Sequence, residues 1–436
     1  MPTPHKNSNA LPPPAPQFPP AALLWCLWAI LALTAVWRVM LSLNVLVQPT
    51  LATGMGAVVV HWRRLDQFVP WIALLLLTLG GHLSGTALRR QRTARLLTIL
   101  FAIGIALTAL SIVWDEFALP ESLSPPIAWG ADIALALAAI ATAGRQFTLL
   151  IRALYATPSA TTPTGVTLLD LWRFLAAQWA LLMVAAMLYL RATLPTGGLL
   201  DTERIRSLIF LLPAAAILPQ AMMIAGISWS SDLLLAGART NPALAEPRLR
   251  AWILSFVCIN LAAFLMVVPF QALAIPGSIF ALFAIVMYLV GFPPQTWRTL
   301  GGKIVLFSWF LLALAWMFLL LERTLLVNAQ ISTAYYGGAW RHLWATGALV
   351  LWLLGMGTLA TERLLPAAQP RRAIQLAVIL MIAGVVLTST LLFITSLQQG
   401  ESQVPILRAL PLGTLPELAA IVIAGAALLR SMRLQR

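Results

Sequence analysis

Long apolar stretches alternate with short polar gaps along the whole chain. Most of these stretches reach the roughly 20 residues that an α-helix needs to cross about 30 Å of hydrocarbon. Backbone amides cannot remain unpaired in lipid, so spanning segments of this kind must be helical. We therefore predict an all-α, multi-pass membrane helix bundle. About twelve transmembrane helices are expected, at Ala22–Leu46, Phe68–Leu88, Leu97–Val113, Ile127–Ala143, Leu171–Leu190, Leu208–Gly226, Ala251–Leu273, Ile279–Phe292, Ile304–Leu326, Trp344–Ala360, Ile374–Leu397 and Leu415–Leu429.

The gaps between these stretches are too short to hold a separate soluble domain. Residues 21–436 are therefore expected to form one twelve-helix membrane domain. Residues 1–20 are rich in proline and are predicted to form a disordered cytoplasmic tail. The first apolar stretch is too long for the core of a signal peptide, so we expect it to remain as a membrane anchor.

Composition and charge support a membrane location. The chain is 60% hydrophobic and 10% charged, which excludes a soluble globular domain and a disordered one. Its formal net charge of +14 does not indicate a nucleic-acid partner, because the arginines gather in the even-numbered gaps, as at Arg89–Arg95. Acidic residues such as Asp115 and Glu121 lie in odd-numbered gaps. The positive-inside rule then predicts a bacterial inner-membrane protein with both termini in the cytoplasm.

A weak internal repeat accompanies this pattern. Arg64, Arg206 and Arg341 each precede an apolar stretch that runs inward, and they are separated by 142 and 135 residues. Nearly equal spacing predicts three tandem units of four helices. The alternative interpretation is that arginine at a helix start only anchors the helix at the membrane interface.

Three four-helix units are the plan of haem-copper oxidase subunit I, and one segment resembles a family that shares this plan. The segment RHLWATGALVLWLLGMGTLATERLLP is similar to the corresponding segment of the NnrS family. A weaker similarity covers HWRRLDQFVPWIALLLLTLGGHLSGTALRR, through His61, Gly80 and Gly81. The residues that match in the first segment are Arg341, His342, Gly347, Gly355, Met356, Gly357, Arg363, Leu364 and Pro366.

The resemblance implies a function linked to haem or to nitric oxide in resistance to nitrosative stress. In the superfamily, helices two and ten supply axial histidines to a haem, and helices six and seven supply copper ligands. The sixth and seventh stretches, Leu208–Gly226 and Ala251–Leu273, contain no histidine, so a three-histidine copper centre is missing. We therefore expect a binding protein rather than an enzyme that reduces oxygen or nitric oxide.

Three histidines are candidate haem ligands. His82 lies near the inner end of the second helix. In the predicted repeat it matches Ala360, which is 18 residues after His342 and so roughly 27 Å below it at 1.5 Å per residue. Only His61 and His342, which both precede inward-running helices and are expected near the outer face, could share one iron. The alternative is that both are interfacial histidines with structural hydrogen bonds.

Arginines surround this candidate site. Arg38, Arg63, Arg64 and Arg341 are expected to gather near the outer ends of helices one, two and ten. A guanidinium fork suits a haem propionate, another carboxylate or a lipid phosphate. The alternative is that each arginine reaches the lipid headgroups.

Acidic residues inside the predicted helices are few. Asp132, in the fourth helix, is expected to have an arginine partner. The helix centres otherwise contain almost no acidic residues, which argues against a proton pump or an ion-coupled transporter.

Two other function classes compete with the haem-linked interpretation. A transporter or lipid-handling protein would have a cavity lined by Arg38, Asp132 and the proline-containing sixth helix. A structural or assembly partner of another membrane complex would need no cavity. In every case, the lipid bilayer is a partner, and the ligand would be haem or another anionic small molecule.

Overall fold

The chain is helical wherever its structure is described. The computed structural model describes residues 21–47, 64–80, 91–116, 124–155, 168–193, 216–227, 245–267, 271–324, 333–364, 371–398 and 402–433. These residues form α-helices, short 3-10 helices and π-helical turns, with no strand among them. The predicted all-α bundle is therefore confirmed, whereas the tail at residues 1–20 lies outside the described residues.

Each of the twelve predicted stretches contains a described helix. The short elements η1 (Arg64–Phe68) and η9 (Leu343–Ala348) each adjoin a helix of the central region, and a helix without a label covers Leu218–Ile227. The main helices are α1 (Ala21–Val47), α4 (Val69–Gly80), α5 (Gln91–Glu116), α6 (Ser124–Tyr155), α7 (Leu168–Thr193), α10 (Ala245–Val267), α11 (Ala274–Val290), α12 (Leu300–Thr324), α13 (Thr333–His342), α14 (Leu349–Leu364), α15 (Arg371–Leu397), α16 (Gln403–Arg408) and α17 (Pro411–Arg433).

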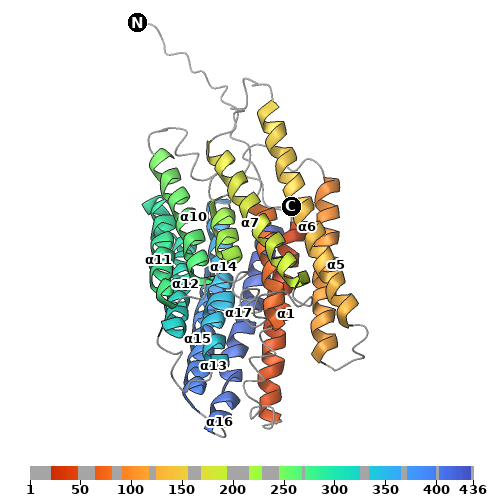
Figure 1. The fold of residues 1–436 in the computed structure, drawn as a ribbon. Helices are drawn as coiled ribbons and strands as arrows, with labels where there is room; N and C mark the ends of the chain where they lie inside the picture. The colour runs from red at the N-terminus through yellow and green to blue at the C-terminus, as the bar shows by residue number, and fades with distance from the viewer. Residues whose placement is uncertain are drawn as a thin grey trace.

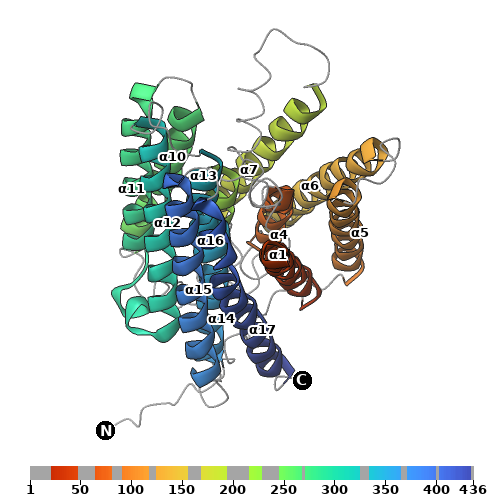
Figure 2. The ribbon, with the colours of Figure 1, turned by 90° about the horizontal axis from the view of Figure 1, so that it is seen from below.

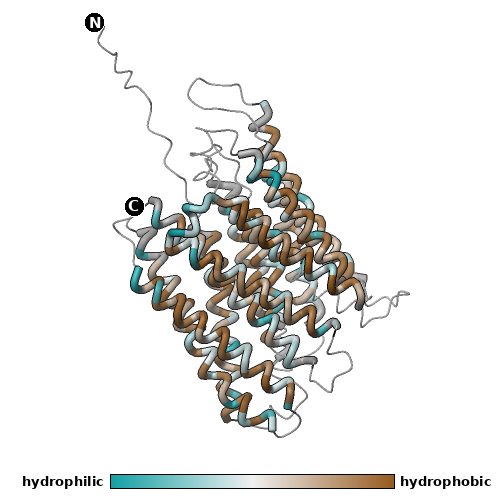
Figure 3. Tube along the Cα trace, turned by 90° about the vertical axis from the view of Figure 1, so that its left-hand side faces the viewer, coloured by the Kyte–Doolittle hydropathy of each residue, from teal (hydrophilic) through white to brown (hydrophobic). Residues whose placement is uncertain are grey.

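Nine helical spans in the described part of the chain are long and apolar enough to cross a membrane. Leu65–Gly80, Leu218–Ile227 and Ala274–Val290 are apolar but shorter. Hydrophobic positions dominate the helices, and hydrophilic ones gather toward helix ends (Figure 3). Large apolar side chains such as Ile140 and Phe264 also remain on the outside of the bundle. These properties are typical of helices that face lipid.

The helices form one elongated bundle (Figure 1). Seen along the bundle, α1, α4, α5 and α6 lie on one side and α10, α11 and α12 on the other, with α13 to α17 between them (Figure 2). Val45, near the end of α1, packs in one cluster with Leu407 and Leu410, just before α17. The two helices therefore run in opposite directions, and α1 begins on the side where α17 ends.

Three helices are enclosed by the others. All twelve residues of α4 are buried, as are residues 216–227. In the span Tyr335–Leu359, 89% of the most apolar stretch is buried, against 33–50% in the other eight long spans. These three are the predicted second, sixth and tenth helices. Helices that are apolar all round belong in the centre of a bundle.

The three central helices approach one another closely at small residues. A Cβ added to Gly80 would lie 2.8 Å from the Cα of Ala225. A Cβ added to Gly226 would lie 3.2 Å from the Trp352 ring. Small residues allow this close approach of helices. One central helix from each predicted four-helix unit agrees with the three-unit plan, while rotational symmetry between the units stays a prediction.

The predicted start of the tenth helix was wrong. The helix begins at Thr333, passes through the π-helical turn Leu343–Ala348 and ends at Leu364, instead of covering only Trp344–Ala360. The polar pair Arg341 and His342 had been interpreted as the edge of the membrane segment. Both lie inside the helix, because their side chains face other helices rather than lipid.

Candidate functional site: a buried polar cluster beside a small pocket

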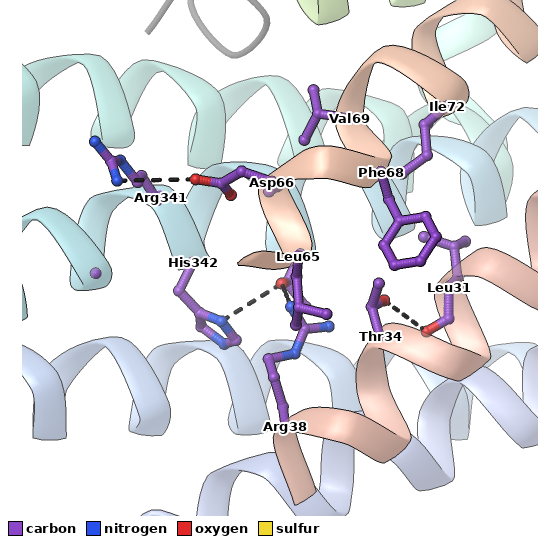
Figure 4. Close-up of a pocket in the computed structure, with 13 residues that line it drawn as sticks. Leu31, Thr34, Arg38, Leu65, Asp66, Phe68, Val69, Ile72, Arg341 and His342 are labelled. Carbon is purple, nitrogen blue, oxygen red and sulfur yellow. Dashed lines mark hydrogen bonds and ion pairs between the residues drawn. The ribbon is translucent and has the colours of Figure 1, made fainter. Parts of the chain in front are cut away.

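A small pocket lies between the first, second and tenth helices. Its walls come from α1, from η1 with the start of α4, and from α13 with η9. Arg38 and His342 point toward the same space from opposite sides, and Leu65 and Phe68 close it from the second helix (Figure 4). The cavity measures about 60 Å³ and is partly open. Because a buried water needs roughly 10–15 Å³ of such volume, the pocket has room for a few waters or a ligand of similar size.

The wall that the tenth helix gives to the pocket includes a π-helical turn. This turn, Leu343–Ala348, directly follows His342 and contributes Ala345 and Thr346 to the lining. Thr346, within this turn, accepts a 2.5 Å hydrogen bond from Arg38 Nη1. Its hydroxyl also lies 3.4 Å from His342 Nδ1. Turns of this kind are often found at functional sites.

His342 forms a buried pair with Glu417 from α17. The His342 Nε2 and Glu417 Oε1 atoms are 2.8 Å apart, and the two side chains are 2% and 1% exposed. Thr388 of α15 donates a second hydrogen bond, also 2.8 Å long, to the same carboxylate oxygen. Three helices therefore meet at one carboxylate. Groups of this kind are costly inside a membrane and are kept there mainly for function.

Glycines make room for the carboxylate between α15 and α17. A Cβ added to Gly384 would lie 2.7 Å from Glu417 Cγ and 2.7 Å from the Gly413 carbonyl oxygen. A Cβ added to Gly413 would lie 2.2 Å from the Thr388 hydroxyl. The two helices are therefore close enough for Thr388 to reach Glu417.

Arg38 is the buried cation of the site. It is 8% exposed and lies inside α1, and it interacts electrostatically with Glu417 and Asp66. Its Nη1 donates to Thr346, whereas its Nε has no hydrogen-bond acceptor among the described residues. The side chain does not extend to the lipid headgroups, which was the alternative interpretation of its position.

Asp66 and Arg341 lie at the more exposed part of the pocket wall. The Arg341 Nη1 and Asp66 Oδ2 atoms are 3.8 Å apart, and each side chain is 19% exposed. The Arg341 guanidinium also lies over the Trp340 ring, 5.2 Å from its centre. This looser pair links η1 to α13 (Figure 4).

The structure brings together three of the six predicted site residues. Arg38, Arg341 and His342 all line the pocket. His61 and Arg63 lie outside the described residues, and only the backbone of Arg64, at the start of η1, is described. His342 is nine residues from the start of its helix, about 14 Å at 1.5 Å per residue. His342 therefore lies inside its helix rather than before it, while its place near the outer face stays a prediction.

The pocket beside His342 does not fit a haem as it stands. Both ring nitrogens have polar neighbours, with Glu417 at Nε2 and Thr346 at Nδ1. A cavity of about 60 Å³ is far below the roughly 300–1,000 Å³ of pockets for drug-sized ligands. Within the described residues, no group of three or more His, Cys, Asp or Glu side chains is placed to hold a metal ion.

Sequence reasoning missed Glu417, Thr388 and Thr346. Glu417 is an acidic residue inside the apolar span Gln403–Ala427, and the rule that intramembrane acids indicate function would have identified it. The argument that helix centres lack acidic residues was therefore wrong at this position. The arginine partner expected for Asp132 is confirmed, because Arg191 Nη1 lies 3.2 Å from its carboxylate.

Comparisons with known proteins leave the chain without a family assignment. No protein-family model matches it, and no curated protein matches it. The site must therefore be interpreted from its own geometry.

Proposed function

We propose that this chain is an inner-membrane transport protein that binds its solute in the pocket between α1, η1 and α13. The observation that supports this most directly is Arg38, a buried cation inside a membrane-spanning helix that faces a partly open cavity. Ionisable residues inside membranes typically mark substrate or ion pathways. The pocket lies where the first and third predicted four-helix units meet.

A purely structural role explains this site less well. Structural polar groups in a buried network are expected to have all their hydrogen bonds satisfied. Here Arg38 Nε and Glu417 Oε2 both lack hydrogen-bond partners among the described residues. Open hydrogen-bonding capacity beside a cavity supports ligand binding.

Transport requires that the pocket can be reached from each side of the membrane in turn. This is tested with a single cysteine at Ala345, which lines the pocket, in a chain whose Cys26 and Cys258 are replaced by alanine. A membrane-impermeant thiol reagent is added to one face or the other of oriented vesicles. The transport proposal predicts modification from both faces. Modification from one face only would indicate a static binding site and would contradict transport.

A cysteine at Ala348 serves as the matched control. Ala348 lies in the same π-turn but is fully buried away from the pocket. It should stay unmodified from either face. Equal modification of both cysteines would indicate local unfolding of the tenth helix rather than access to a pocket.

The finer topology is part of the same proposal. We propose twelve spanning helices, both termini in the cytoplasm and the bacterial inner membrane as the location. The opposite directions of α1 and α17 support an even number of spans. The three short apolar helices are then counted as spans as well.

A haem- or nitric-oxide-linked function is the second candidate, favoured by the similarity of the Arg341–Pro366 segment to the NnrS family. It requires one ring nitrogen of His342 to leave Glu417 or Thr346 and bind the metal, and it also requires a wider pocket. Purified protein should then show a Soret absorption band that His342→Ala removes. Protein without this band after growth with added haem precursor would exclude the candidate.

A further inference from the structure

We infer that the ligand of this pocket is a small free carboxylate of about the size of acetate, held by Arg38. This inference rests on the proposed function, because it specifies the solute of the same pocket. The juxtaposition that carries it is one incompletely paired, buried guanidinium against apolar walls in a cavity with room for only a few heavy atoms.

The charge of the ligand follows from the unpaired groups that line the pocket. Arg38 Nε and Arg341 Nη1 are buried N–H donors without a hydrogen-bond acceptor among the described residues, whereas the unpaired Glu417 Oε2 belongs to a residue that does not line the pocket. The Thr34 hydroxyl, which also lines the pocket, donates to the Leu31 carbonyl oxygen at 2.9 Å and so is not available to donate to a ligand. A ligand that pairs with Arg38 Nε must therefore supply a hydrogen-bond acceptor, and a carboxylate is the acceptor that matches a guanidinium best.

The protein's own carboxylates leave this requirement open. Glu417 Oε1 is engaged with His342 and Thr388, its Oε2 has no hydrogen-bond partner among the described residues and does not bond Arg38, and Asp66 pairs with Arg341. Both acids act on Arg38 through charge, while Asp66 pairs with Arg341 and Glu417 with His342. The charged groups around the pocket are thus Arg38, Arg341 and Asp66, with Glu417 behind His342. A bound anion would give Arg38 the direct partner that buried cations usually have.

The size and the walls of the pocket select the kind of carboxylate. About 60 Å³ has room for a few heavy atoms, so a small carboxylate can lie wholly inside the cavity, whereas a lipid headgroup with its glycerol or a haem propionate with its ring cannot. Leu31, Leu65 and Ile72 supply apolar wall opposite the polar side. A short alkyl group fits such a wall, whereas a strongly hydrated inorganic anion would lose its water shell there.

The test measures thermal unfolding of the purified full-length protein in detergent with sodium acetate, at constant ionic strength. Acetamide, which has the same shape without the charge, and sodium chloride are the matched controls. A ligand that binds only the folded state raises the unfolding midpoint as its concentration rises. We expect a saturable upward shift with acetate, none with chloride, and little or none with acetamide.

Variants assign the shift to the pocket. Arg38→Gln should remove it, while Arg173→Gln, at a buried arginine of α7 outside the pocket, should keep it. If Arg38→Gln does not fold, Arg38→Lys keeps the charge and loses the fork, and it should weaken the shift at least several-fold. No acetate shift in the wild type, or a shift that persists in both Arg38 variants, would overturn the inference.

One outcome separates this inference from the proposed function. If acetamide shifts the midpoint as much as acetate does, the pocket binds small solutes without regard to charge. The carboxylate assignment then fails, while access of the Ala345 cysteine from both faces would still support transport. If the Ala345 cysteine is not modified from both faces but the acetate shift remains, the protein binds a carboxylate and does not transport it.

Discussion

His342 Nε2 lies 2.8 Å from Glu417 Oε1, although the two residues are 75 positions apart in the chain. The contact joins α13 to α17 in the interior of the bundle, and Thr388 of α15 donates to the same oxygen. Arg38 of α1 donates to the Thr346 hydroxyl, which lies 3.4 Å from His342 Nδ1, the other ring nitrogen. One polar cluster therefore connects four helices beside the pocket.

Glu417 can be tested by comparing two replacements. Glu417→Ala removes the acceptor of both His342 and Thr388, and each buried group left unpaired costs about 1–3 kcal/mol. We expect the free energy of unfolding to fall by about 2–4 kcal/mol. Glu417→Gln retains a side-chain oxygen and should lose less than half as much. Denaturant unfolding in detergent measures both, and equal losses would show that the carboxylate oxygen is not the shared acceptor.

Gly384 tests the close packing of α15 on α17. In Gly384→Ala the new Cβ would lie 2.7 Å from Glu417 Cγ, so the helices must separate, at a cost of about 1–3 kcal/mol. Gly425→Ala is the matched control, because no atom lies within 4 Å of the position where its Cβ would be placed. Alanine there should be neutral or should stabilise the helix by up to about 1 kcal/mol. Unfolding midpoints that fall equally in both variants would contradict the packing described here.

Topology can be tested at the two ends of α5. Because α5 (Gln91–Glu116) is a single helix, fusion sites after Arg92 and after Glu121 should lie on opposite sides of the membrane. The arginine-rich gap that precedes it predicts that the Arg92 site is cytoplasmic. Paired reporters that are active on either side of the membrane measure this. Two reporters on the same side would refute the twelve-helix topology.

The fold could be predicted well because membrane helices follow from simple physical rules. A segment of about 20 apolar residues has few alternatives to a helix in lipid, and all twelve predicted stretches contain one. The rule misplaces the start of a helix when polar residues at that end face other helices. Arg341 and His342 face other helices, so the polar segment from Thr333 to His342 could remain helical without contact with lipid.

The candidate site was predicted in part. Arg38 attracted notice because a lone arginine within an apolar helix needs an explanation, and it lies in the pocket. Glu417 was overlooked because it is the third residue of the predicted stretch Leu415–Leu429 and could be taken for a helix-end residue. The structure places it 1% exposed, facing His342. Partners this far apart in sequence cannot be paired without knowledge of the packing of α13, α15 and α17.

Binding of a small carboxylate in the pocket is tested by the rate of thiol modification at Ala345. The experiment uses the Ala345→Cys chain without its two native cysteines, with acetate, acetamide or chloride added before the reagent. We expect acetate to slow modification in a saturable manner, acetamide and chloride to leave the rate unchanged, and Arg38→Gln to remove the protection. The same modification rate with and without acetate would show that the pocket does not bind this anion.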